Sequence, residues 1–155
     1  MKVSILAVGR LRAGPERALL DDFRARFDRT GRPLGLGPLT EVEVEGKPGA
    51  SKAAEGALLL ARLPPGAWLC ALDERGEAMD SPGFARLLDR WKMERRDAAF
   101  LIGGADGLDG TVTGRADLLL SFGRMVWPHA LARVMLAEQI YRAATILAGS
   151  PYHRA

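Results

Sequence analysis

Phe100-Leu101-Ile102-Gly103-Gly104-Ala105-Asp106-Gly107 is an apolar run that stops abruptly at a glycine-rich turn. The run predicts a buried strand over 98–102, with main chain that lacks Cβ atoms at its carboxyl end. In open α/β proteins this arrangement leaves room for a nucleotide-like ligand. The glycines match neither the dinucleotide-binding fingerprint nor a P-loop, so a plain tight turn is the alternative.

Strand-like and helix-like segments alternate on both sides of this stretch. We expect further strands at 3–8, 40–45, 67–72 and 117–121, and helices at 15–28, from Ser51 to about Leu63, from Ser81, and from His129 to about Ala148. A polar turn should occupy 73–76, and Leu19 and Leu58 should lie on buried helix faces. The order is typical of an α/β fold, a mostly parallel sheet with helices on both faces.

The length and composition favour one domain over residues 1–155. No apolar run approaches the roughly 20 residues that a bilayer span needs, and the N-terminus lacks the features of a secretory signal. With one cysteine, Cys70, no intrachain disulfide can form, and with two histidines no metal site is expected. We therefore expect a cytoplasmic protein that has no metal and no membrane contact.

The positive charge is unevenly distributed. Residues 1–117 are balanced, so the whole net charge of +3 lies in residues 118–155, where four arginines accompany Glu138 alone. A local positive region favours a phosphate-bearing partner. The alternative is that the chain uses arginine everywhere, since it has 18 arginines and 4 lysines.

A second loop near the C-terminus adds aromatic side chains: Ser121-Phe122-Gly123-Arg124-Met125-Val126-Trp127-Pro128-His129. These could enclose an adenine ring while backbone groups bind its edge. Leu72 ends another expected strand and Asp73 follows it, so both would lie at the same edge of the sheet. Phe122 and Trp127 could instead be ordinary core or dimer contacts.

The last helix and the tail after it are unusual. The helix is apolar almost all round, so a second copy of the chain is expected to cover the side away from the sheet. A helix central to the monomer is the alternative. The ending Pro151-Tyr152-His153-Arg154 supplies a stacking ring, a titratable group and a phosphate binder.

Several motifs, taken in order over the full length, resemble one family. They are Leu72-Asp73, Arg90-Trp91-Lys92, Leu101-Ile102-Gly103-Gly104 with Gly107-Leu108, Pro128-His129 with Leu131 and Arg133-Val134, Glu138-Gln139 with Tyr141-Arg142-Ala143, and Pro151-Tyr152-His153-Arg154. They resemble the RlmH family of SPOUT-class methyltransferases. The resemblance implies transfer of a methyl group from S-adenosylmethionine to N3 of a pseudouridine in 23S ribosomal RNA. It also implies a homodimer and a C-terminal trefoil knot.

The resemblance further implies roles for residues. The cofactor would be held by Leu72, Gly103, Phe122, Gly123, Arg124, Met125, Val126 and Trp127. Because Phe-Gly-Arg departs from the family pattern, we assign binding to the backbone of this loop. The substrate would be held by His129, Tyr152, His153 and Arg154, and catalysis would use His153, Arg154 and Arg142, with the tail supplied by either subunit.

A chain with no separate RNA-binding domain is expected to recognise a large preformed surface, so assembled ribosomes are the expected substrate. Two other functions compete with this one. A non-catalytic ribosome-binding factor could keep the fold without the methyl donor. A nucleotide-dependent oxidoreductase is disfavoured, because such enzymes have a glycine-rich turn after the first strand. In this chain the first strand is followed by Gly9-Arg10-Leu11-Arg12.

Overall fold

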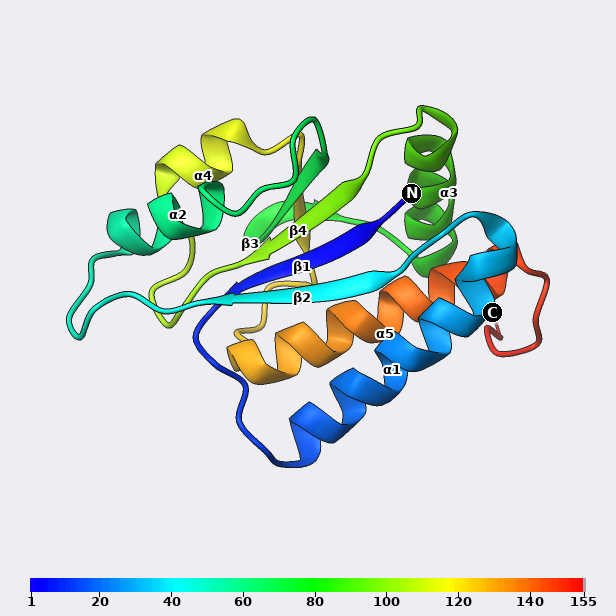
Figure 1. The fold of residues 1–155 in the computed structure, drawn as a ribbon, viewed down its shortest axis with the longest axis horizontal. Coiled ribbons are helices and arrows are strands. Elements are labelled where there is room, and N and C mark those ends of the chain that lie inside the picture. The colour runs from blue at the N-terminus through cyan, green and yellow to red at the C-terminus, as the bar shows by residue number, and fades with distance from the viewer. Residues whose placement is uncertain (155) are drawn as a thin grey trace.

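A computed structural model describes residues 1–154, and its strands form one parallel sheet (Figure 1). The strands are β1 (Val3–Val8), β2 (Leu39–Val44), β3 (Trp68–Ala78), β4 (Ala98–Ile102) and β5 (Leu118–Ser121). Their spatial order is β2-β1-β4-β3-β5, and every neighbouring pair is parallel. The predicted α/β class is confirmed, and the carboxyl ends of all these strands meet at one edge.

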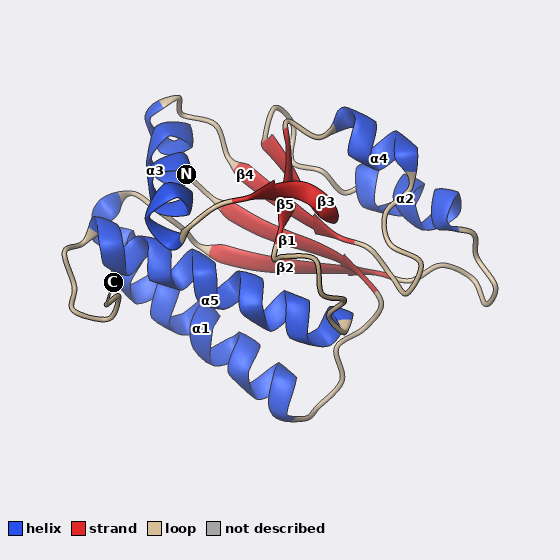
Figure 2. Ribbon diagram, turned by 180° about the vertical axis from the view of Figure 1, so that it is seen from behind, coloured by secondary structure: helices blue, strands red, loops and turns tan. Residues whose placement is uncertain are grey.

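Helices cover both faces of the sheet (Figure 2). On one face lie α1 (Pro15–Gly31), α3 (Ser81–Met93) and α5 (His129–Leu147), and on the other lie α2 (Lys52–Leu60) and α4 (Gly110–Arg115). A short 3-10 turn, Arg32–Leu34, follows α1. The strands supply two separate cores, because Ile5 faces the first set of helices while Leu6 faces the second. None of the helices in residues 1–154 is long and apolar enough to cross a membrane.

The helices begin where local chemistry satisfies their free backbone N–H groups. Ser51 Oγ accepts from the amide of Ala54 and starts α2 as the sequence predicted. Asp80 does the same for the amide of Gly83, so α3 is capped by Asp80 and Ser81 is its first residue. Helix α4 was not expected from the sequence, because it is six residues long and has glycine at two positions, a composition with weak helix propensity.

Two predicted inward-facing leucines point outward. Leu19 is 47% exposed and Leu58 is 38% exposed, whereas their neighbours Leu20 and Leu59 are fully buried. Adjacent residues on a helix point about 100° apart, so one of each pair must leave the core when the other faces the sheet. The spacing of apolar residues therefore predicted α1 and α2 correctly, but the buried face predicted for each helix was too wide.

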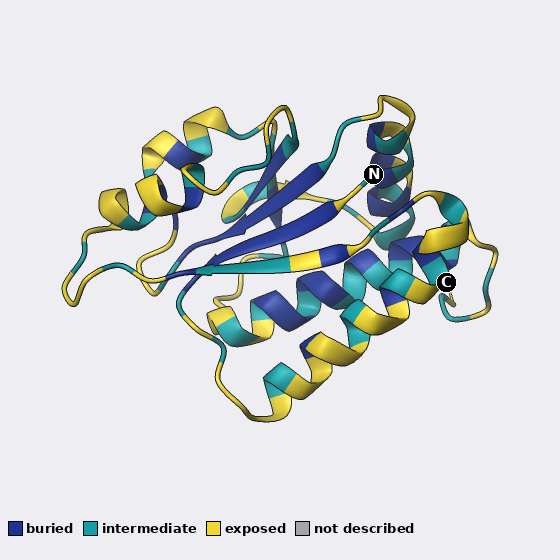
Figure 3. Ribbon diagram, viewed as in Figure 1, coloured by how far each residue is buried: buried dark blue, intermediate teal, exposed yellow. Residues whose placement is uncertain are grey.

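The chain itself covers much of α5, contrary to the expectation that a second copy would do so. The helix lies against the sheet and packs on α1 and α3 (Figure 3). Buried residues run along most of its length, among them Val134, Leu136, Ile140 and Thr145. Its apolar character is therefore explained within one chain, except near its first turn, where Leu131 is 40% exposed.

A buried ion cluster ties α5 to the edge strand β2. The guanidinium of Arg133, only 3% exposed, donates from Nη1 to Glu43 at 2.8 Å and to Glu41 at 3.3 Å. Arg17 of α1 donates to Glu41 at 2.7 Å. Two guanidinium groups thus face two carboxylates. Burial acts to raise the pKa of Glu43, but hydrogen bonds from the amide of Leu11 and from Arg133 outweigh it, so the pKa is lowered.

We expect Arg133→Met to lower the free energy of unfolding by about 3 kcal/mol, because it removes one of the two guanidinium groups that neutralise Glu41 and Glu43 and leaves the cluster with an excess negative charge. The double variant Arg133→Met/Glu43→Met should regain part of this loss. Urea unfolding at a fixed protein concentration measures both effects. A loss below about 1 kcal/mol for the single variant would show that the cluster contributes little.

Candidate active site

Strand β3 carries an irregularity at the carboxyl edge of the sheet. Its pairing with β5 shifts after Leu72, because Leu120 is opposite both Leu72 and Glu77. The segment 73–76 therefore bulges out of the ladder. We predicted that β3 would end here in a polar turn, which is wrong, since the strand resumes and continues to Ala78. Bulges of this kind redirect the backbone beside functional sites.

Side chains and one glycine hold the bulge in place. The Asp73 carboxylate accepts from the backbone amide of Arg75 at 2.8 Å and from its guanidinium at 3.0 Å and 2.9 Å. These bonds hold the pKa of the Asp73 carboxyl below its usual range. A Cβ at Gly76 would lie 2.6 Å from the carbonyl of Leu119, so only glycine allows the bulge to lie directly on β5.

The glycine-rich loop after β4 folds back on itself. The amide of Gly107 donates to the carbonyl of Gly104 at 3.0 Å, and Gly107 adopts a φ of 78°. A Cβ at Gly103 would lie 2.5 Å from the carbonyl of Gly107. The loop is thus a tight turn whose closure requires the absence of a side chain at Gly103.

The loop between β5 and α5 supplies the third wall. Ser121 Oγ accepts from the amide of Gly123 at 3.0 Å and donates to the carbonyl of Glu74 at 3.1 Å, which ties this loop to the bulge of β3. Beyond it, Met125, Val126 and Trp127 are 73%, 86% and 40% exposed. Large apolar side chains with this much exposure indicate a surface that binds a ligand or another protein chain.

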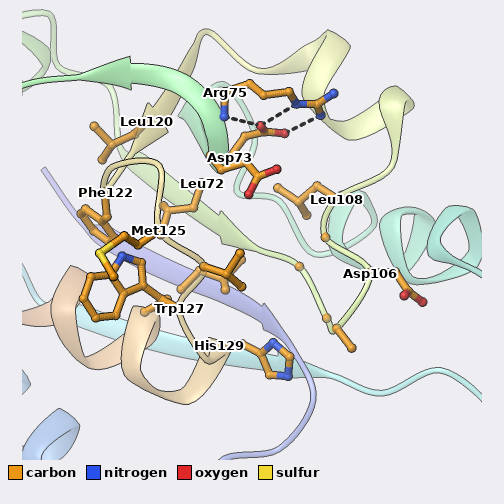
Figure 4. A pocket seen from close by; sticks show the side chains of 18 of the residues that line it. Leu72, Asp73, Arg75, Asp106, Leu108, Leu120, Phe122, Met125, Trp127 and His129 are labelled. Atoms are coloured by element: carbon orange, nitrogen blue, oxygen red, sulfur yellow. Dashed lines mark hydrogen bonds and ion pairs between the residues drawn. The ribbon is translucent and has the colours of Figure 1, made fainter.

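The three segments enclose one cavity of about 410 Å³ (Figure 4). Its volume is in the range of small-molecule sites. Of the residues expected to hold a cofactor, all except Arg124 line it: Leu72, Gly103, Phe122, Gly123, Met125, Val126 and Trp127. His129 also lines it, whereas Arg124 is exposed outside the cavity wall.

Other lining residues come from places that the sequence did not suggest. Lys52, at the start of α2, lines the cavity, as do Arg75 and Ala132. Lys52 is on the opposite face of the sheet from α5 and belongs to no recognisable motif. Its positive charge is one of the weaker causes that lower the pKa of the Asp73 carboxyl. Only the topology places this ammonium group at the cavity.

The predicted catalytic tail is not at this cavity. Arg142 follows His129 by 13 residues on α5, about 20 Å along the helix axis. Residues Arg142, Tyr152, His153 and Arg154 are absent from the lining of the cavity. The structure therefore brings His129 and the predicted cofactor residues other than Arg124 together near the start of α5, and the tail lies outside this cavity.

The tail folds back onto the middle of α5 and is held there by a polar cluster around Glu138. Glu138 Oε1 accepts from Arg142 at 2.6 Å and from the Tyr152 hydroxyl at 2.9 Å, and Arg142 lies 3.3 Å from Nδ1 of His153. The Tyr152 ring packs on Tyr141 and beneath the Arg142 guanidinium. Burial and the bond to Glu138 raise the pKa of the Tyr152 phenol. Its ring and hydroxyl are thus already engaged.

A second, more apolar cavity of about 900 Å³ lies beside the tail. Met79, Phe84 and Met135 line it together with His153. It also shares Leu120, Phe122 and Gly123 with the first cavity. The two cavities therefore adjoin across the segment that leads from β5 into the aromatic loop.

Comparison with known proteins gives consistent results. A family model described as a predicted SPOUT methyltransferase matches residues 1–153. Proteins named ribosomal RNA large subunit methyltransferase H, from Ruegeria pomeroyi and Dinoroseobacter shibae, are 63% and 64% identical over 155 residues, with 99% of both chains covered.

The fold also matches a solved structure. A probable methylase family protein from Haemophilus influenzae aligns with a TM-score of 0.52 at 12% identity, over 99% of this chain and 70% of that chain. At this identity the match concerns the fold alone. The family model and the full-length relatives go further: the chain belongs to the SPOUT methyltransferase family, among the ribosomal RNA large subunit methyltransferases H.

Proposed function

We propose that the protein transfers a methyl group from S-adenosylmethionine to N3 of a pseudouridine in 23S ribosomal RNA, in the cytoplasm and on assembled ribosomes. The observation that carries the proposal is the cavity at the carboxyl edge, where Leu72, Gly103 and the loop after β5 meet. The full-length relatives of the protein are named as methyltransferases of large-subunit ribosomal RNA. A trefoil knot around this loop is part of the proposal, as the family resemblance implies.

The residues at the cavity fit an adenosine-containing methyl donor. Leu72, Phe122 and Trp127 provide apolar walls for a purine, and the backbone around Gly103 and Gly123 offers N–H and C=O groups without intervening Cβ atoms. When bound, S-adenosylmethionine supplies a methyl group on a positively charged sulfur. Residues of the chain would bind and orient it and keep water away from the cavity.

Methylation at N3 requires this ring nitrogen to lose its proton. A histidine can accept a proton near neutral pH, and a guanidinium can stabilise negative charge on the ring oxygens. We assign these roles to His153 and Arg154, with His129 contacting the substrate at the cavity wall. Arg142 holds His153 in place, and Tyr152, which bonds Glu138 and packs on Tyr141, anchors the tail and contributes to substrate binding beside His153.

The separation between the tail and the cavity favours a site shared by two chains. Since Arg142, Tyr152, His153 and Arg154 do not line the cavity of their own chain, His153 and Arg154 would reach the cavity of the partner subunit. The exposed side chains of Met125, Val126, Trp127 and Leu131, and the apolar cavity beside the tail, would be covered in such a homodimer. The proposed active site is therefore shared between two chains.

The cofactor site can be tested at Gly103. Gly103→Ala should raise the Kd for S-adenosylmethionine at least about tenfold, because the added Cβ displaces the loop through Gly107. Isothermal titration calorimetry measures the Kd, and the melting temperature reports whether the variant is folded. The control is Gly114→Ala, where a Cβ meets nothing within 4 Å. Equal Kd values for both folded variants would place the donor elsewhere.

The tail can be tested separately. His153→Ala and Arg154→Ala should each lower the rate of methylation by about 100-fold or more, as expected when proton transfer or charge stabilisation is lost. The Kd for S-adenosylmethionine should stay unchanged, since the proposed contacts to the donor come from Leu72, Gly103 and the loop after β5, and the tail is assigned to the target base. Wild-type rates in both variants would remove the tail from the reaction.

Mixed dimers test the shared site. Gly103→Ala and Arg154→Ala should each be nearly inactive alone. After mixing and exchange of subunits, a heterodimer has one intact cavity facing one intact tail, so about a quarter of the wild-type activity should return. A radiolabelled methyl donor measures this directly. No recovery, with exchange shown by mass spectrometry, would mean that each tail serves its own chain.

The form of the substrate is a further prediction. Ribosomes that lack the methyl group should be methylated much faster than free 23S ribosomal RNA, because so small a chain needs a preformed surface for recognition. Initial rates at equal concentrations of the two substrates measure the difference. Equal rates would show that the RNA strand alone is recognised.

A further inference from the structure

The β1–α1 loop, residues 9–14, carries two arginines that the reaction outlined above does not use. Arg10 and Arg12 are both exposed. Arg10 has only a long, exposed ion pair with Glu45, at 3.9 Å, and within residues 1–154 Arg12 forms no ion pair. Exposed pairs of this kind contribute little, so both guanidinium groups are available to a ligand.

The neighbouring β2–α2 loop, residues 45–51, adds a further basic residue, Lys47. Because β1 and β2 are adjacent and parallel, both loops leave the same edge of the sheet (Figure 1). The amide of Gly9 donates to the carbonyl of Val44 at 2.8 Å and joins their starting points. Together the two loops hold three basic residues and one acidic residue, Glu45, and Lys52 follows at the start of α2. The balance of charge over residues 1–117 conceals this local excess.

The β1–α1 loop is held at three points by the buried ion cluster. Arg133 donates to the carbonyl of Gly9 at 3.1 Å, Glu43 accepts from the amide of Leu11, and Arg17 donates to the carbonyl of Leu11 at 3.2 Å. The backbone that bears Arg10 is thus bonded on both sides. Such fixation reduces the entropy that the loop would lose on binding a ligand.

The cluster also leaves the charge of the loop uncompensated. Its two carboxylates, Glu41 and Glu43, are already paired with Arg133 and Arg17. The cluster is therefore neutral, and these carboxylates do not offset the positive charge of Arg10 and Arg12 above them. This differs from an ordinary solvated surface, where arginines pair with nearby acids.

The loop is also close to the proposed active site. Arg133, which bonds to Gly9, is one helical turn from His129, and Ala132 beside it lines the cavity. Figure 4 shows His129 near the end of β1. A nucleic acid whose target base enters the cavity would have its neighbouring phosphates within reach of this edge of the sheet.

We propose that Arg10 and Arg12 form a rigidly held site for RNA phosphates, which positions the ribosomal RNA on either side of the target base. The inference rests on the proposed function for the identity of the RNA. Backbone contacts of this kind fix register and orientation without reading sequence. This edge of the sheet is thus an RNA-binding surface in the first third of the chain, apart from the basic C-terminal quarter.

The test is the salt dependence of binding to unmethylated ribosomes. Arg10→Gln/Arg12→Gln should raise the Kd at physiological salt and reduce the slope of log Kd against log salt by about one to two, one for each lost phosphate contact. The control is Arg62→Gln/Arg115→Gln, which removes the same charge from exposed positions outside these loops. The Kd for S-adenosylmethionine should be unchanged in both variants.

The outcomes separate this inference from the proposed function. A lower slope in the Arg10/Arg12 variant alone supports the phosphate site, whether or not methylation is detected. An unchanged slope, or the same decrease in the control variant, would overturn it and leave the methyltransferase proposal intact. If the wild-type protein methylates no ribosomal RNA, the proposed function fails; if it also does not bind ribosomes, the phosphate site fails with it.

Discussion

Backbone packed directly on backbone is the constraint on which the carboxyl edge of this sheet depends. A Cβ at Gly103 would lie 2.5 Å from the Gly107 carbonyl, and one at Gly76 would lie 2.6 Å from the Leu119 carbonyl. The first contact closes the loop after β4 on itself, and the second lets the bulge of β3 lie directly on β5. The cavity between this loop and the bulge is lined in large part by main chain, which suits a ligand recognised through backbone hydrogen bonds.

The same edge of the sheet also holds buried and exposed charges at different depths. Arg133 and Arg17 neutralise Glu41 and Glu43 beneath the surface, and Arg10 and Arg12 stay exposed above them. Burying a neutral cluster costs less than burying an unpaired charge, and it holds α1, β2 and α5 together at one end of the molecule. A fixed cavity and a fixed positive surface therefore lie side by side on one scaffold.

Much of the fold and part of the site could be predicted from the sequence, for reasons visible in particular residues. Val3–Val8 and Ala98–Ile102 are short apolar runs that only buried parallel strands explain. The bulge at Asp73 was mistaken for a turn because a run of polar residues that ends in glycine is typical of both a turn and a bulge. Arg133 was noticed only as part of a family motif, since the carboxylates that it bonds lie about 90 residues away, and Lys52 gave no signal. The tail was singled out by its residue types and by resemblance, but its docking on Glu138 and Arg142 is visible only in the fold.

The central claim is that the cavity between Leu72, Gly103 and the aromatic loop holds the methyl donor. A crystal structure of the protein grown with S-adenosylmethionine tests it most directly. The account predicts density for the adenosine between the Gly103–Gly107 turn and Trp127. Density for the donor at any other position, with this cavity empty, would contradict it.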